Sequence, residues 1–140
     1  MPLYGFVPST GGVFTGSVSF ARHIHGTVTT VAVTASGGAG TSPPDPVVTA
    51  GSTDLGGTVT WGTGTTPNTQ AQLAVAFGAA WTIPGGGGPH VVIEPLNSAT
   101  QALGLYVGGV SPTGFNVYAA VAPTGGQSAG TYQFSYIVMG

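Results

Sequence analysis

The sequence lacks cysteine and has almost no charge. Its 140 residues include one Lys or Arg, three Asp or Glu and three His, which gives a formal net charge of -2. Without cysteine, the chain cannot be a disulfide-stapled scaffold, a thiol enzyme or a cysteine-based zinc module. Arg22 is the single basic side chain, and one arginine cannot form the basic surface that displaces counterions from phosphates. We therefore expect no nucleic-acid partner.

Long hydrophobic runs are also missing. The longest nearly pure apolar stretch is Leu73 to Trp81, far shorter than the roughly 18 residues that a helix needs to cross a bilayer. The chain does not open with the basic and then apolar pattern of a secretory signal. We therefore expect no membrane insertion.

The residues that are abundant favour β-structure. Glycine occurs 26 times and proline 11 times, and valine is far commoner than leucine. Valine and threonine are restricted at χ1 and suit a pleated sheet, whereas glycine and proline mark turns, so the composition predicts an all-β chain. Charged residues usually protect exposed strand edges, and this chain has few of them. We therefore expect it to cover its sheet edges by forming an oligomer.

Three regions can be distinguished along the chain. In residues 1–40, apolar and small polar residues alternate from Phe14 onward, which predicts an N-terminal anchoring or stalk-like β-segment. Residues 41–50 are rich in proline and follow a run of glycines, so we expect a linker. Residues 51–140 contain short strand-like runs between turn residues, which predicts an antiparallel β-sandwich knob. The expected strands are 57–61, 71–77, 90–94, 102–107, 114–121 and 131–139, and 98–103 could form one helical turn.

Two stretches resemble parts of bacteriophage tail-fibre proteins. Gly11–Phe20 is similar to the GG-x-x-T-G element at the start of stalk repeats in these fibres. The C-terminal half is similar to the small knob modules that end many of them. The chain departs from the family in being short for a tail fibre and in lacking a long stalk. The knob-like phrases are Val91–Asn97, Leu103–Val107, Thr113–Val117 and Tyr132–Val138, preceded by Phe77, Trp81 and Pro84.

The resemblance implies a homotrimeric virion protein on the exterior surface of a phage particle. It would be a minor tail or fibre-type component, with its own copies and other virion proteins as partners. Weak contacts of each lobe with a host cell-surface glycan could then add up across three copies. Because the chain is short, a capsid decoration protein or a head fibre is one alternative. A carbohydrate-binding β-sandwich module is another.

His23 and His25 are the sharpest candidates for a binding site. Residues i and i+2 of a strand point to the same face. If three parallel copies surround a threefold axis, these histidines supply six imidazole nitrogens, which could coordinate a transition metal such as iron or zinc. The resemblance supports this hypothesis, because trimeric phage fibres use His-x-His in this way. The alternative is that both histidines lie on the polar, solvent-facing side of a strand.

The carboxylates do not predict an enzyme. A glycosidase needs two carboxylates beside its sugar, and only Asp45, Asp54 and Glu94 are present. Asp45 lies in the proline-rich linker, and Asp54 lies in a loop of the kind in which aspartate forms Asx-turns. His90 has no Ser or Asp at a spacing typical of a catalytic triad. We therefore expect no catalytic residues and no enzymatic activity.

Four aromatic residues could form a stacking platform for a sugar: Trp61, Trp81, Tyr106 and Tyr118. In a small β-sandwich, aromatic residues more often lie in the core or anchor an interface, and we favour that interpretation. A sugar-binding module would instead need exposed aromatic rings beside Asn, Gln or Thr side chains.

Overall fold

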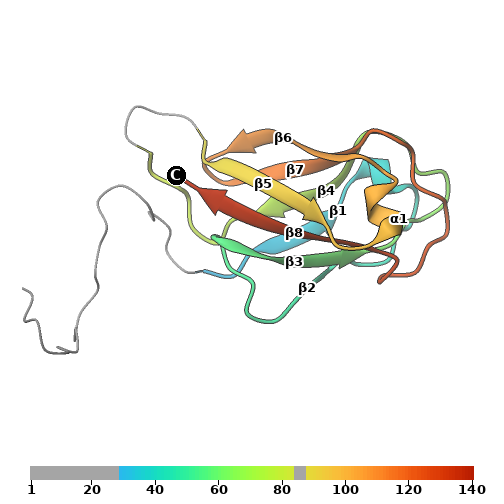
Figure 1. The fold of residues 1–140 in the computed structure, drawn as a ribbon, viewed down its shortest axis with the longest axis horizontal. Coiled ribbons are helices and arrows are strands. Elements are labelled where there is room, and N and C mark those ends of the chain that lie inside the picture. Colours follow the sequence, from blue (N-terminus) through green and yellow to red (C-terminus); the bar gives the residue numbers. More distant parts are fainter. Residues whose placement is uncertain (1–28, 84–87) are drawn as a thin grey trace, which may run out of the picture.

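The computed structural model describes residues 29–83 and 88–140, and these residues form two antiparallel four-stranded sheets that pack face to face (Figure 1). We call them sheet one and sheet two. Sheet one has the order β1 (Ala32–Ala35), β4 (Ala71–Ala76), β7 (Gly114–Ala119) and β6 (Leu105–Ser111). Sheet two has the order β2 (Val47–Val48), β3 (Gly56–Trp61), β8 (Tyr132–Met139) and β5 (His90–Pro95). The remaining elements are a 3₁₀ turn, η1 (Gly37–Ala39), and one helical turn, α1 (Ser98–Gln101).

The core lies between the sheets and follows from the alternation of the strands. In β8, the even-numbered residues are buried and the odd-numbered residues are half-buried or exposed, as the sequence predicts. The facing strands of sheet one bury their apolar residues against this row. The largest fully buried apolar members of the core are Val59, Trp61, Leu73, Val75, Val117, Phe134 and Tyr136.

Two strands lie in regions that the sequence assigned to other roles. β1 falls within the predicted segment 1–40, yet it pairs with β4 and places Val33 opposite Val75. β2 falls within the predicted linker 41–50 and pairs with β3, with Val48 opposite Val59. In both cases valine residues next to the core pair with a neighbouring strand. The glycine and proline residues around them in the sequence do not predict this pairing. The rest of the predicted stalk-like segment, 1–28, lies outside the described residues.

The chain between β5 and β7 differs from expectation in one detail. The predicted helical turn is present as α1, and its N-cap Asn97 accepts a 2.8 Å hydrogen bond from the backbone N–H of Thr100. Because this turn continues to Gly104, β6 begins at Leu105 rather than Ala102. β6 then runs to Ser111, past a register shift against β7 that begins at Gly108.

The described residues are thus nearly all β, which confirms the predicted class. Within the same residues, no helix is long and apolar enough to cross a membrane.

Candidate functional sites

The predicted metal ligands His23 and His25 lie outside the described residues. Within 29–83 and 88–140, no group of three or more His, Asp or Glu side chains could hold a metal ion. The metal site at a threefold axis therefore stays a prediction from the sequence.

Asp54 is buried, and three segments converge on its side chain. The carboxylate accepts hydrogen bonds from the backbone N–H groups of Gly78 at 3.0 Å and Ala79 at 3.3 Å, and from the Thr29 hydroxyl. The Asp54 backbone N–H also donates to the Thr29 carbonyl at 2.9 Å. With an exposure of 1%, Asp54 offers no surface to a substrate. Its hydrogen bonds join the segment before β1, the loop before β3 and the loop after β4.

Tyr136 lies beneath this carboxylate in the core. Its hydroxyl donates a 2.7 Å hydrogen bond to the Thr53 carbonyl. Burial, with a smaller contribution from the negative charge of Asp54, raises the pKa of Tyr136 from 10.0 to about 12. Both effects disfavour the phenolate, so Tyr136 is a neutral hydrogen-bond donor at ordinary pH.

The other candidate acid and base groups are not brought together. Asp45 is exposed in the segment before β2. His90 and Glu94 both point outward from β5, but four residues of extended strand separate them by about 13 Å. His90 is opposite Met139, and Glu94 is opposite Ser135. Among the described residues, these groups form no pair that resembles an acid–base site.

The four aromatic candidates divide into two pairs. Trp61 and Trp81 are buried, as the core interpretation predicts, and they cannot stack on a sugar. Tyr106 and Tyr118 lie instead on the outer face of sheet one, where Tyr106 is 50% exposed. Their rings are nearly parallel, with centroids 5.3 Å apart and an interplanar angle of 15°. A core position is therefore wrong for this pair, whereas the other half of that interpretation, an anchor in an interface, stays a prediction.

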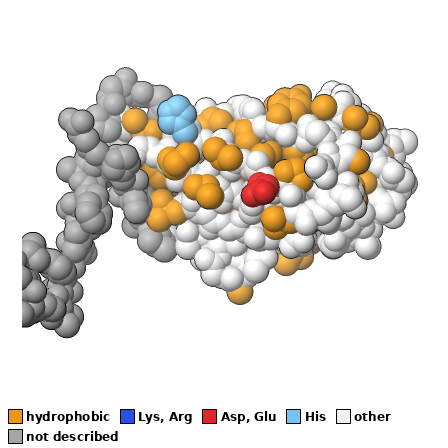
Figure 2. All heavy atoms as spheres, in the orientation of Figure 1, with side chains coloured by type: hydrophobic (Ala, Val, Ile, Leu, Met, Phe, Trp, Pro, Cys, Tyr) orange, Lys and Arg blue, Asp and Glu red, His pale blue; other side chains and the backbone are white. Residues whose placement is uncertain are grey.

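The outer face of sheet two carries a cluster of apolar side chains, which we call the apolar patch. It consists of Val92, Ile137 and Met139, with exposures of 54%, 57% and 48%. Val92 and Ile137 are direct cross-strand neighbours, and Gly56 on the other side of Ile137 adds no side chain. Figure 2 shows this side of the molecule, where apolar side chains gather over β5 and β8.

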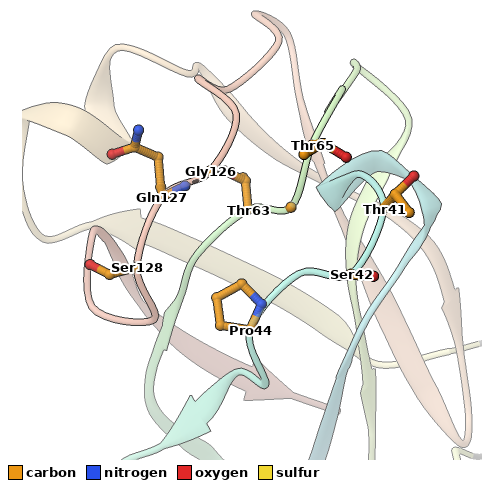
Figure 3. Close-up of a pocket in the computed structure, with 9 residues that line it drawn as sticks. Thr41, Ser42, Pro44, Thr63, Thr65, Gly126, Gln127 and Ser128 are labelled. Atoms are coloured by element: carbon orange, nitrogen blue, oxygen red, sulfur yellow. Dashed lines mark hydrogen bonds between the residues drawn. The ribbon is translucent and has the colours of Figure 1, made fainter.

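A pocket of about 550 Å³ lies among loops at the end of the sandwich that carries α1 (Figure 3). Three segments form it: 41–44, 63–65 and 126–128. In Figure 3, Thr41 and Ser42 lie on one side of Thr63, Gln127 and Ser128 lie on the other, and the Pro44 ring closes the lower edge. The lining consists of hydroxyl, amide, proline and backbone groups and contains no charged side chain. The lining therefore offers hydrogen-bonding groups but no charged side chain to pair with an ionic ligand.

The shape of the pocket is fixed by backbone segments that pack closely against each other. Gly64 lies so near the carbonyl of Thr41 that a Cβ atom on it would come within 1.8 Å of that oxygen. Ser42 and Thr66 adopt positive φ angles of 53°, a conformation that is costly for a β-branched threonine. No sequence motif indicates this pocket, because its residues come from three separate turn-like segments.

Comparison with protein-family models, with curated proteins and with solved structures finds no significant match to this chain.

Proposed function

We propose that this chain is a structural protein of a bacteriophage virion, a homotrimeric minor tail or fibre-type component that displays its sandwich on the exterior of the particle. The observation that carries the homotrimer is the apolar patch on sheet two. The phage assignment depends on the similarity of Gly11–Phe20 and the C-terminal phrases to tail-fibre proteins.

The apolar patch has the character of a surface that another protein covers. Val92, Ile137 and Met139 are each about half exposed and follow one another across two paired strands. Contiguous apolar patches of this kind on a soluble protein commonly mark interaction sites. Charged residues are depleted at the centre of such interfaces, and Glu94, two residues from Val92 on the same face, would lie at the rim of this one. A sister chain with the same patch would give each copy an apolar partner.

The composition predicts that exposed sheet edges favour an oligomer, but the edges of these sheets are less exposed than that prediction assumes. β5 and β6 run close to each other along one side of the sandwich, and β1 and β2 come close on the other. The margins thus partly cover one another without hydrogen bonding into a single sheet. The face of sheet two, rather than its edges, is therefore the surface that we assign to the trimer.

The mass of the native full-length protein in solution tests the assembly. We expect light scattering to give three times the chain mass of 13.7 kDa. Ile137→Lys would place a charge in the centre of the patch and should give monomers, because burying an unpaired ammonium is costly. Thr69→Lys adds the same charge at an exposed loop residue and should leave the trimer intact. A mass of 13.7 kDa at high concentration, or an intact Ile137→Lys trimer, would contradict the assignment.

The position on the particle needs a separate experiment. A capsid decoration protein or a head fibre would present the same trimer on the head instead of the tail. Immunogold labelling of the particles that carry this chain, with antibodies against the sandwich, should mark the tail. Labels distributed over the capsid would support the decoration alternative, and absence of labelling from the particles would contradict a virion protein.

A further inference from the structure

The outer face of sheet one, opposite the apolar patch, offers an aromatic pair next to a hollow. We infer that this face binds a neutral polysaccharide, with Tyr106 as the stacking residue and Asn116 as the main hydrogen-bonding residue. Binding of such a polysaccharide would explain how the protein attaches to a host surface, so its biological role rests on the proposed function. The binding itself depends only on the sandwich.

The tyrosine pair is a rigid platform. Tyr106 of β6 is directly opposite Tyr118 of β7, and the two rings stack at 5.3 Å. Tyr118 lies against the backbone of Gly108, where an added Cβ would come within 2.8 Å of the ring. Tyr118 thus lies between Gly108 and Tyr106, and Tyr106 is 50% exposed. An exposed and immobilised aromatic ring is the group on which the C–H face of a sugar can pack.

A hollow of about 260 Å³ lies on the same sheet, and its lining includes Asn116, two residues before Tyr118, but neither tyrosine. Its floor is made of small side chains on β1 and β4, because Thr34 is opposite Ala74 and Ala32 is opposite Ala76. The turn between β6 and β7 forms its rim. These small side chains keep the surface low from the edge strand β1 to β7, so an extended ligand can lie across the strands.

Asn116 supplies the polar group of this hollow. It lies on β7 two residues before Tyr118, so both side chains leave the same face about 7 Å apart. Asn116 is half-buried, and within the described residues its side-chain amide makes no hydrogen bond. The Thr34 hydroxyl, also in the hollow, makes none either. A half-buried amide with two free donors and a free acceptor fits the paired hydroxyl groups of a sugar.

The absence of charge selects the ligand class. Neither the tyrosine pair nor the lining of the hollow includes a charged side chain. An anionic polysaccharide would lose hydration here without gaining a cationic partner, which is unfavourable. A neutral polysaccharide meets both features of the surface, because it presents apolar C–H faces and hydroxyl groups along one chain.

Native gels that contain a soluble neutral polysaccharide test this inference on the full-length protein. We expect dextran, mannan, galactomannan or laminarin to retard the protein, and alginate, which is anionic, to have no effect. Tyr106→Ala should weaken retardation about tenfold or more, whereas Tyr106→Phe keeps the stacking ring and should stay within about threefold. Asn116→Ala should also weaken it about tenfold.

Gln127→Ala serves as the matched control, because it alters the loop pocket and leaves sheet one intact. It should bind as the unchanged protein does, and circular dichroism should show that each variant is folded. Failure of all four neutral polymers to retard the protein, or full binding by folded Tyr106→Ala, overturns the inference. A change of solution mass on Tyr106→Ala would instead identify this face as a contact between copies and would also overturn it. A trimer without glycan binding contradicts only this inference, and a glycan-binding monomer contradicts only the assembly.

Discussion

Asp54 is a buried carboxylate that is stabilised by hydrogen bonds. The described residues include no Lys or Arg that could form a salt bridge with it. Asp54→Ala would leave the N–H groups of Gly78 and Ala79 without acceptors in a buried loop. Each unsatisfied buried donor costs about 1–3 kcal/mol, so we expect the free energy of unfolding to fall by about 3 kcal/mol. Asp54→Asn keeps one acceptor oxygen and should lose less. Urea titration at one fixed protein concentration measures both variants.

Asp45→Ala is the control for that experiment, because Asp45 is exposed and makes no hydrogen bond in the described part of the chain. It should change the free energy of unfolding by less than about 0.5 kcal/mol. Equal effects of Asp45→Ala and Asp54→Ala would show that the buried hydrogen bonds contribute nothing measurable.

Tyr136 makes stability depend on pH in the alkaline range. Its pKa is about 12 in the folded protein and 10.0 as the ordinary value, so the unfolded chain loses this proton first as the pH rises. The stabilising effect is complete below pH 10 and disappears between pH 10 and 12. Two pKa units correspond to about 2–3 kcal/mol, and the wild type should lose that much more than Tyr136→Phe over this interval. Parallel stability curves for the two proteins would contradict this assignment.

At the scale of the elements, two loops cross at Gly64 and hold the end of the sandwich together. The Thr41 segment and the Thr65 segment form a β-bridge there, and no side chain fits between them. Gly64→Ala should lower the free energy of unfolding by more than about 2 kcal/mol, because backbone rather than a flexible side chain must move. Gly130→Ala places its methyl in open space and should be nearly neutral. Thermal unfolding of both variants measures the difference, and a neutral Gly64→Ala would show that the crossing adapts freely.

The strands that the sequence predicts well are those whose two faces differ. β3, β4, β5, β7 and β8 were placed within two residues at each end, because one side of each strand meets the core and the other meets solvent. β1 and β2 were missed as parts of the sandwich because they are short and lie among glycine and proline. The sequence did predict β-structure around β1, but the places of β1 and β2 in the sandwich come from pairing with β4 and β3, which is a tertiary effect.

The candidate sites were harder to predict than the strands, because they depend on register. Nothing in the spacing of Tyr106 and Tyr118 says that they are cross-strand partners, since the pairing follows from the β6–β7 hairpin and its bulge. The role of Asp54 likewise depends on Thr29 and Gly78, more than 20 residues away in each direction. The sequence could identify Asp54 only as a loop aspartate.

At the scale of the whole molecule, the two sheets divide the outer surface by chemistry. Sheet two offers an apolar patch flanked on the same face by His90 and Glu94, which suits a contact with another copy. Sheet one offers tyrosine, asparagine and threonine above a floor of small residues, which suits a polar ligand that comes and goes. If the patch is buried around a threefold axis, sheet one of every copy faces outward, so three weak sites could act together.

A threefold axis, if the proposed trimer forms, would give the metal hypothesis a defined stoichiometry. His23 and His25 provide only two imidazoles per chain, and two ligands hold a metal weakly, whereas three chains provide six. We expect purified full-length protein to contain iron or zinc at one ion per three chains, measured by mass spectrometry of the metal. His23→Ala should lose the ion, and His90→Ala should retain it, because His90 is a lone exposed histidine on β5. One ion per chain, or metal that persists in His23→Ala, would exclude a shared axial site even if the protein is a trimer.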